Sequence, residues 1–402
     1  MTTENNVPNE ATGGFRVADF TRYLPGPMAS RLLADLGGRV IKIENTRGGD
    51  ANRSSSPPIH GQGLFHVALN AGQRSLAIDP RSPDWPRVVQ ACARWADVVL
   101  VSGLPENLPR MGIDFDSMVR ENPRLVHCNL TGYGERGPFR GLPAHGLNVD
   151  AFAGIVPLEW KDGIPYPQSS YQAAGAPLGG LFAALGVLAA LRRRDASGEA
   201  QRVHVSLFGA AIWWNWRHVT SVANLGEPFR SYADYGGRFA TYVTSDRKVI
   251  LACPVERGFW ELFCTILALP DEWKRRGSWE HGKTDHGSDY PWERAEIAKK
   301  IIEKPRDHWA HEFLTGKIPF ASVLSVDEML AGEQVAAINA MRTVDVQGHS
   351  ARIPSLPISF EIGGAAGNPG AALSTPELGE HNVEILAELG LDLDLAPAPG
   401  RP

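Results

Sequence analysis

Apolar and polar positions follow two different periods along the first half of the chain. Short runs that are apolar at every position or at alternate positions predict strands at 15–20, 39–44, 97–101 and 125–130. Between and after them, apolar residues at helical spacing predict helices at 28–36, 85–95 and 179–194. Strands that alternate with helices in this way form parallel βαβ units. We therefore expect an α/β protein with a doubly wound, Rossmann-like parallel sheet.

The pattern becomes irregular after about residue 216. The stretch 217–285 is rich in tryptophan and loop residues, with one helix expected near 258–267. Regular patterns then predict helices at 292–303 and 326–339, a segment at 321–325, and strands near 343–346 and 357–360. This shift predicts a large domain from residues 1–215 and 330–402 and a smaller α+β middle domain from residues 216–329. We expect 363–376 and the last dozen residues to be loop or tail.

Composition narrows the possible partners. The net charge of -5 and the pI near 6.2 give no bulk attraction for nucleic acid or for an anionic membrane, so any bound anion needs a local basic site. The four cysteines lack CxxC spacing, and the twelve histidines are scattered, so we expect neither disulfides nor a metal site. No apolar run reaches the ~18 residues of a membrane span and no signal peptide is visible, so we expect a cytoplasmic protein.

Several ordered blocks of the sequence resemble the family III CoA-transferases, also called the CaiB/BaiF family. The blocks are Asp19-Phe-Thr-Arg-Tyr-Leu-Pro-Gly-Pro27, Leu33-Ala-Asp-Leu-Gly-Gly-Arg-Val-Ile-Lys-Ile-Glu44, Asn70-Ala-Gly-Gln-Arg-Ser-Leu-Ala-Ile-Asp79, Asn122-Pro-Arg-Leu-Val126, Thr131-Gly-Tyr-Gly134 with Gly137-Pro138, Leu378-Gly-Glu-His-Asn382 and Ile385-Leu-Ala-Glu-Leu-Gly390. Together they cover essentially the whole chain.

The resemblance implies a CoA-binding large domain, a smaller middle domain and two chains threaded through each other as interlinked rings. In the transferases an aspartate attacks the acyl-CoA, which gives a mixed anhydride and then an enzyme-bound CoA thioester. CoA then passes to an acceptor acid. Free CoA or an acyl-CoA would be the substrate, and the resemblance implies no metal.

The attacking aspartate of the family matches Ala176 in this sequence. The family segment has the form Asp-x-x-x-Gly-Leu, whereas this chain has Ala176-Pro-Leu-Gly-Gly-Leu181. A methyl group can act neither as nucleophile nor as base. Nearby acids such as Asp150, Glu159 and Asp162 fall in segments whose counterparts are not catalytic, so the resemblance implies no catalytic acid.

A second departure from the transferases lies at His145-Gly146, where they commonly carry an aromatic residue and an acid. His145 matches the histidine that the racemase branch of the family uses as one of two bases. The second base of the racemases is the aspartate that Ala176 replaces, so His145 alone would invert a carbon centre poorly. His145 is thus a candidate for an auxiliary catalytic residue or a CoA contact. An equal alternative is that His145 is a structural histidine, hydrogen-bonded at a loop turn.

CoA carries three phosphate groups and requires fixed cations or helix N-termini. The resemblance implies the following cofactor-binding positions: Leu24, Pro25, Asn45, Ile78, Asp79, Arg81, Arg110 and His145. Asn45 stands where transferases often have arginine, and Ser102-Gly-Leu-Pro105 replaces a familiar Asn-Phe-Arg-Pro run. The alternative for Arg81 and Arg110 is that both are solvated surface charges.

Three functions follow from these residues. The chain could be the non-catalytic subunit of a heteromeric transferase, such as the succinyl-CoA:benzylsuccinate type, in a heterodimer or heterotetramer with an aspartate-bearing chain. It could be an acyl-CoA hydratase, dehydratase or epimerase that uses His145, or a CoA-binding scaffold, and in those cases a homodimer. An engineered alanine in an ordinary transferase is a further explanation. The tryptophans of Trp213-Trp-Asn-Trp216 are expected to pack in a core or a subunit interface.

Overall fold

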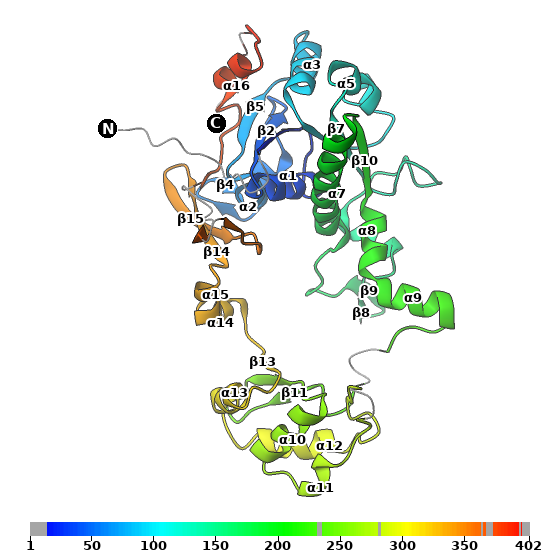
Figure 1. Cartoon of the computed structure of the whole chain (residues 1–402), viewed down its shortest axis with the longest axis vertical. Helices are drawn as coiled ribbons and strands as arrows, with labels where there is room; N and C mark the ends of the chain where they lie inside the picture. Colours follow the sequence, from blue (N-terminus) through cyan, green and yellow to red (C-terminus); the bar gives the residue numbers. More distant parts are fainter. Residues whose placement is uncertain are drawn as a thin grey trace. The chain divides into compact units, whose positions relative to one another are not determined.

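The structure, a computed structural model, describes residues 14–230, 235–279, 283–362, 365–366, 373–393 and 395. Two compact units divide the chain (Figure 1). One contains the residues up to Val219 and those from Ala336 onward, and the other contains Thr220–Val335. The loop predicted at 363–376 and the predicted C-terminal tail lie largely outside the described residues.

A six-stranded parallel sheet forms the centre of the first unit. Its strands are β1 (Phe15–Asp19), β2 (Gly38–Glu44), β5 (Arg74–Ala77), β6 (Val98–Ser102), β7 (Val126–Thr131) and β10 (Gln201–Ser206). They lie in the order β10-β7-β6-β1-β2-β5, and every neighbouring pair is parallel. The chain order therefore reverses between β1 and β6, as it does in doubly wound folds. The predicted α/β class with a parallel central sheet is confirmed.

Helices cover both faces of this sheet. On one face α1 (Pro25–Asp35) and α7 (Gly175–Ser197) bury residues such as Val17. On the other, α3 (Trp85–Trp95), α5 (Phe115–Glu121) and α16 (Asn382–Glu388) pack against residues such as Ala18. Because successive side chains of a strand point to opposite faces, strands buried on both faces need nearly continuous apolar runs. Figure 1 shows α7 beside β7 and β10.

Shorter elements complete the first unit. They are the 3₁₀ helix η1 (Ala51–Ser54), the helices α2 (Leu64–Asn70), α4 (Leu108–Met111), α6 (Gly146–Phe152) and α8 (Leu207–Trp214), and the strands β3 (Pro58–Ile59), β4 (Gln62–Gly63), β8 (Leu158–Lys161), β9 (Ile164–Pro167), β14 (Met341–Val346), β15 (His349–Pro354), β16 (Glu361–Ile362), β17 (Ala365–Ala366) and β18 (Leu373–Ser374). Two helices, α9 (Trp216–Leu225) and α15 (Glu333–Ala337), cross the boundaries between the units.

The second unit is a small antiparallel sheet packed with helices. The strands β11 (Ala240–Val243), β12 (Val249–Ala252) and β13 (Phe320–Ser322) lie in that order. The helices are α10 (Arg257–Ile266), α11 (Asp271–Lys274), α12 (Glu293–Ile301), α13 (Arg306–Thr315) and α14 (Val326–Leu330). Its core is rich in tryptophan and phenylalanine, and the buried Arg238 pairs with Glu293 at 3.0 Å inside it.

Several boundaries differ from the sequence expectations. The helix predicted at 179–194 begins four residues earlier, at Gly175, because a distant side chain caps it, as described below. The helix predicted at 326–339 is two short helices, α14 and α15, interrupted around Gly332. The strand predicted near 357–360 is absent, and β15 at His349–Pro354 pairs with β14 instead.

Helix α7 also departs from the expectation that no segment could span a membrane. It is long and apolar enough by length and composition, but half of its most apolar window is buried. It packs against α1, β7 and β10. A core helix of a doubly wound domain has the same properties.

Candidate functional site

The carboxyl ends of the parallel strands form the edge at which doubly wound domains bind ligands. In such folds the ligand binds where the chain order of the strands reverses, which in this sheet is between β1 and β6. The segments that follow β1, β2, β5 and β6, including the first residue of α1 and the short helix α4, contain Leu24, Pro25, Asn45, Ile78, Asp79, Arg81 and Arg110. The fold thus brings to one edge of the sheet seven positions that are scattered along the sequence.

The loop after β1 leads directly into α1. Leu24 is the N-cap residue of that helix and Pro25 is its first residue, where proline suits the helical backbone. Leu24 packs against a buried cluster that includes Ala176. Tyr23 has a left-handed backbone with φ of 66°, and its amide donates to the Asp50 side chain at 3.0 Å. Leu24 and Ala176 therefore belong to one apolar cluster.

A buried ionic group lies beneath this loop. The ammonium of Lys42 is fully buried, lies 3.1 Å from the Asp50 carboxylate and 3.8 Å from that of Asp19, and donates to the Thr21 carbonyl. Asp19 in turn accepts from both the amide and the hydroxyl of Thr21. Burial opposes the charge of Lys42, but the surrounding carboxylates outweigh it and raise the pKa of the ammonium. These bonds fix the backbone that precedes Leu24.

A second buried pair extends the ionic group. Glu44 accepts two hydrogen bonds from Arg53, at 2.8 and 2.6 Å, and one from the Ser75 hydroxyl at 2.7 Å. Burial alone would raise the pKa of Glu44, but hydrogen bonds and charge from Arg53 lower it to about 2. Sequence reasoning missed this network. The signal was present, because Lys42 and Glu44 share one face of β2 with the apolar Val40.

Basic side chains gather where β2 and β5 end. Arg81 forms a two-point contact with Asp79, at 3.1 and 2.7 Å, and Arg47 reaches the same carboxylate at 3.4 Å. Both arginines are exposed. Asn45 lies at the start of the same loop and accepts from the Arg47 amide. An arginine is thus available two residues after Asn45, which the sequence expectations did not include.

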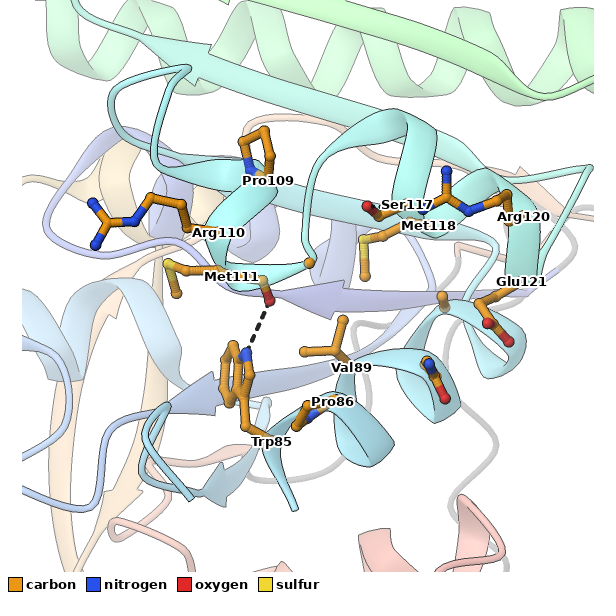
Figure 2. Close-up of a pocket in the computed structure, with 13 residues that line it drawn as sticks. Trp85, Pro86, Val89, Pro109, Arg110, Met111, Ser117, Met118, Arg120 and Glu121 are labelled. Atoms are coloured by element: carbon orange, nitrogen blue, oxygen red, sulfur yellow. Dashed lines mark hydrogen bonds between the residues drawn. The ribbon is translucent and has the colours of Figure 1, made fainter. Parts of the chain in front are cut away.

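Ile78 and Arg110 lie in different surroundings at this edge. The side chain of Ile78 is buried in the core on the α3 face, so its contact with a ligand stays a prediction. Arg110 is exposed on α4 and lines a surface pocket of about 370 Å³ with Trp85 and Met111 (Figure 2). Trp85 donates its indole N–H to the Met111 carbonyl at 2.9 Å. Met111 follows Arg110, so this bond attaches the segment that carries Arg110 to Trp85 at the start of α3. Arg81 precedes Trp85 by four residues and therefore lies close to the same point in the chain.

Ala176 lies in the first turn of α7 and is only 6% exposed. The helix has no capping side chain of its own. Asp150, fully buried on α6, accepts instead from the amides of Ala174 and Gly175, at 2.7 and 2.9 Å, and from the Tyr171 hydroxyl at 2.8 Å. Burial and then the bond to Asp150 raise the pKa of Tyr171. A carboxylate 25 residues away therefore decides where α7 begins.

His145 is the exposed N-cap residue of α6, and its amide donates to Asn148 at 2.7 Å. A Cβ atom at Gly146 would lie 3.6 Å from the Cβ of Ala176. The start of α6 and the start of α7 are thus in contact, and the residues that meet there are glycine and alanine. Neither side chain can attack a thioester or move a proton.

Asp150 is an acid that lies next to this position, and its environment suits a structural role. Three donors already occupy its two oxygens. A carboxylate whose two oxygens already accept three hydrogen bonds is a poor nucleophile. Among the described residues no group of three or more His, Cys, Asp or Glu side chains is placed to hold a metal ion.

Comparison with known proteins agrees with this architecture. Residues 13–382 match the model of CoA-transferase family III. The chain belongs to this family. Relatives include the succinate–glutarate CoA-transferase of Agrobacterium fabrum, 27% identical over 96% of this chain and 97% of the relative. The cinnamoyl-CoA:phenyllactate CoA-transferase of Clostridium sporogenes is 26% identical over 96% of this chain and 95% of the relative.

Other similar proteins extend the comparison. The human alpha-methylacyl-CoA racemase is 27% identical over 94% of both chains. A CAIB/BAIF family protein from Brucella suis has a solved structure with a TM-score of 0.75 and 24% identity, covering 95% of this chain and 100% of that chain. An aspartate-to-alanine mutant of Rv3272 from Mycobacterium tuberculosis gives a TM-score of 0.78 at 24% identity, covering 94% of this chain and 99% of that chain. The structures support the fold, and family membership implies acyl-CoA substrates.

Proposed function

We propose that this chain is the non-catalytic subunit of a heteromeric family III CoA-transferase. An aspartate-bearing homologous chain would supply the nucleophile, and the mixed complex would move CoA from an acyl-CoA such as succinyl-CoA to an organic acid. The named relatives act on dicarboxylic and aromatic acids, which supports an aromatic dicarboxylic acid as acceptor. Their names mention no second subunit, so the heteromer rests on residues of this chain.

The start of α7 carries the proposal. Ala176 occupies the first turn of α7, directly after two residues whose amides donate to Asp150. The neighbouring position on α6 is Gly146, and the buried Asp150 of the same helix is used as a helix cap. The start of α7 therefore lies in the apolar cluster against which Leu24 packs, and neither Ala176 nor Gly146 offers a nucleophile.

An exposed apolar surface supports the proposal that a second chain binds this one. Trp213, Trp214 and Trp216 are each more than half exposed, and Leu225 on α9 is 72% exposed. No residue of α9 is buried. Monomeric soluble proteins rarely expose contiguous apolar surface of this kind. We propose that these helices pack against the partner in an interlinked dimer, and that the complex is cytoplasmic.

Co-expression tests the proposal. The chain expressed alone is expected not to transfer CoA from succinyl-CoA to benzylsuccinate, whereas co-expression with an aspartate-bearing homologue gives a stable mixed complex with activity. Native mass spectrometry of the protein purified from its source reports whether a sister chain accompanies it. Turnover by the lone chain, or a source complex without a homologous chain, would contradict the proposal.

A second candidate is an acyl-CoA reaction that uses His145 as its only base. The similarity to a racemase of the family favours it, as does the position of His145 beside Gly146 and thus close to Ala176. Exchange of the α-proton of an acyl-CoA with solvent deuterium, lost in His145→Ala, would support this function. A CoA-binding scaffold without chemistry would show neither exchange nor transfer.

A further inference from the structure

Tyr133 has a buried hydroxyl without a hydrogen-bond partner among the described residues. The residue is 8% exposed and follows β7 in the Thr131-Gly-Tyr-Gly134 loop. A buried phenol nearly always finds a partner, because burying an unpaired hydroxyl is costly. A binding site explains such an exception when a ligand supplies the missing acceptor.

The surroundings of Tyr133 place it in the proposed site. It belongs to the same buried cluster as Ala176, and Leu24 packs against this cluster. Its ring meets Phe139 and Phe152, each with ring centroids 5.6 Å away, in edge-to-face contacts. Phe139 and Phe152 are themselves 38% and 51% exposed. The cluster thus continues from Ala176 to an open aromatic surface.

We propose that the Tyr133 hydroxyl donates a hydrogen bond to the thioester carbonyl of a bound acyl-CoA, and that Phe139 and Phe152 contact an apolar or aromatic acyl group. This inference rests on the proposed function, since it presumes that the chain binds CoA thioesters. It adds the acyl-group class and a residue that selects it. Tyr133 is a binding residue in this account and takes no part in bond making.

The chemistry of the phenol fits a donor to a neutral carbonyl. Burial raises the pKa of Tyr133, so the hydroxyl keeps its proton at neutral pH. A protonated phenol can donate to the carbonyl oxygen of a thioester, while free CoA offers no such acceptor at this position. Aromatic rings add contact area for a flat acyl group through edge-to-face packing. The hydroxyl should therefore distinguish acyl-CoA from CoA.

Calorimetric titration of the full-length chain with phenylacetyl-CoA, acetyl-CoA and free CoA tests the inference. We expect Tyr133→Phe to weaken phenylacetyl-CoA binding by about tenfold and to leave free CoA unchanged, because one hydrogen bond to the carbonyl is lost. Phe152→Leu should reduce the preference for phenylacetyl-CoA over acetyl-CoA. The melting temperature of Tyr133→Phe should stay the same or rise, since no partner is lost on folding.

Tyr242→Phe in the second unit is the matched control. Its buried hydroxyl donates to the Gly237 carbonyl, so this variant should lose stability without changing the ratio of acyl-CoA to CoA affinity. If Tyr133→Phe binds phenylacetyl-CoA as the unaltered chain does, the inference is wrong while CoA binding stands. An equal loss of affinity for free CoA in Tyr133→Phe would also overturn the inference. Failure of the unaltered chain to bind any CoA species would overturn both the inference and the CoA site.

Discussion

One carboxylate organises the most informative position of this chain. Asp150 fixes the segment from Tyr171 to Gly175 and thereby the start of α7, where Ala176 lies. Asp150 was considered from the sequence only as a displaced nucleophile. Its role as a cap was not predictable, because nothing in local spacing links residue 150 to an amide 25 positions later.

Replacing Asp150 should destabilise the first unit. Asp150→Ala leaves two backbone amides and one hydroxyl without their acceptor, and we expect a loss of about 2–3 kcal/mol in the free energy of unfolding. Asp150→Asn keeps one acceptor oxygen and should lose less. Asp116→Ala, an exposed acid in the first turn of α5, is the control and should change stability by less than about 1 kcal/mol. Chemical denaturation measures all three, and an Asp150→Ala variant as stable as the control would contradict the capping role.

The buried His66 should make stability depend on pH. Burial, and then the charge of Arg53, lower the pKa of His66 to about 3. Its Nε2 lies 3.2 Å from the Pro376 carbonyl and its Nδ1 accepts from Asn70, as a neutral ring would. Below pH ~6.5 the unfolded chain binds a proton that the folded chain does not, so acid favours unfolding.

The expected loss between pH 7 and pH 5 is about 2 kcal/mol from this residue alone. Denaturation at the two pH values measures it, and His66→Gln should reduce the difference by that amount. The exposed His308→Gln is the control and should leave the difference unchanged. Equal pH dependence in His66→Gln and the unaltered chain would show that His66 is not held neutral.

At the scale of elements, periodicity located the strands and helices of the parallel sheet well. Helix 85–95 was predicted at its observed bounds, and the first strands fell within about one residue. This follows from burial on both faces, which makes apolar runs dense. Neither edge strand, β5 or β10, was predicted, although in β10 Val203 and Val205 alternate with polar residues and Gly198 ends the preceding helix.

The contact between α1 and α7 depends on a glycine. A Cβ atom at Gly180 would lie 2.5 Å from the Pro25 carbonyl and 2.7 Å from the Met28 Cβ. Gly180→Ala should therefore destabilise the first unit by about 1–3 kcal/mol despite its better helix propensity. In Gly258→Ala on α10 the new methyl group meets nothing within 4 Å, and this control should be neutral or stabilising. A stabilised Gly180→Ala would show that the two helices separate easily.

At the scale of the whole molecule, the sequence predicted two domains, and the structure forms two compact units with nearby boundaries. The exposure of Trp213, Trp214 and Trp216 was not decided by the sequence, which allowed either core or interface packing. The chain by itself exposes all three. A property that belongs to an assembly cannot be read from the local pattern of one chain.

The exposed helix α9 should be required for association. Leu225→Glu is expected to weaken the oligomer at least tenfold, because burying an unpaired charge in an apolar interface is costly, while the fold of each unit stays intact. Val383→Glu on α16 is the control, since Val383 is 84% exposed and apolar as well. Sedimentation velocity compares the two variants. Unchanged association of Leu225→Glu would remove this surface as the interface.

The central claim is that this chain carries no nucleophile at the start of α7 and serves a partner that does. Intact-protein mass spectrometry after incubation with succinyl-CoA tests it most directly, because acyl transfer to an enzyme carboxylate adds a defined mass to the chain that holds it. In a mixed complex, the added mass should appear on the aspartate-bearing chain and never on this one. A covalent adduct on this chain, alone or in the complex, would contradict the account.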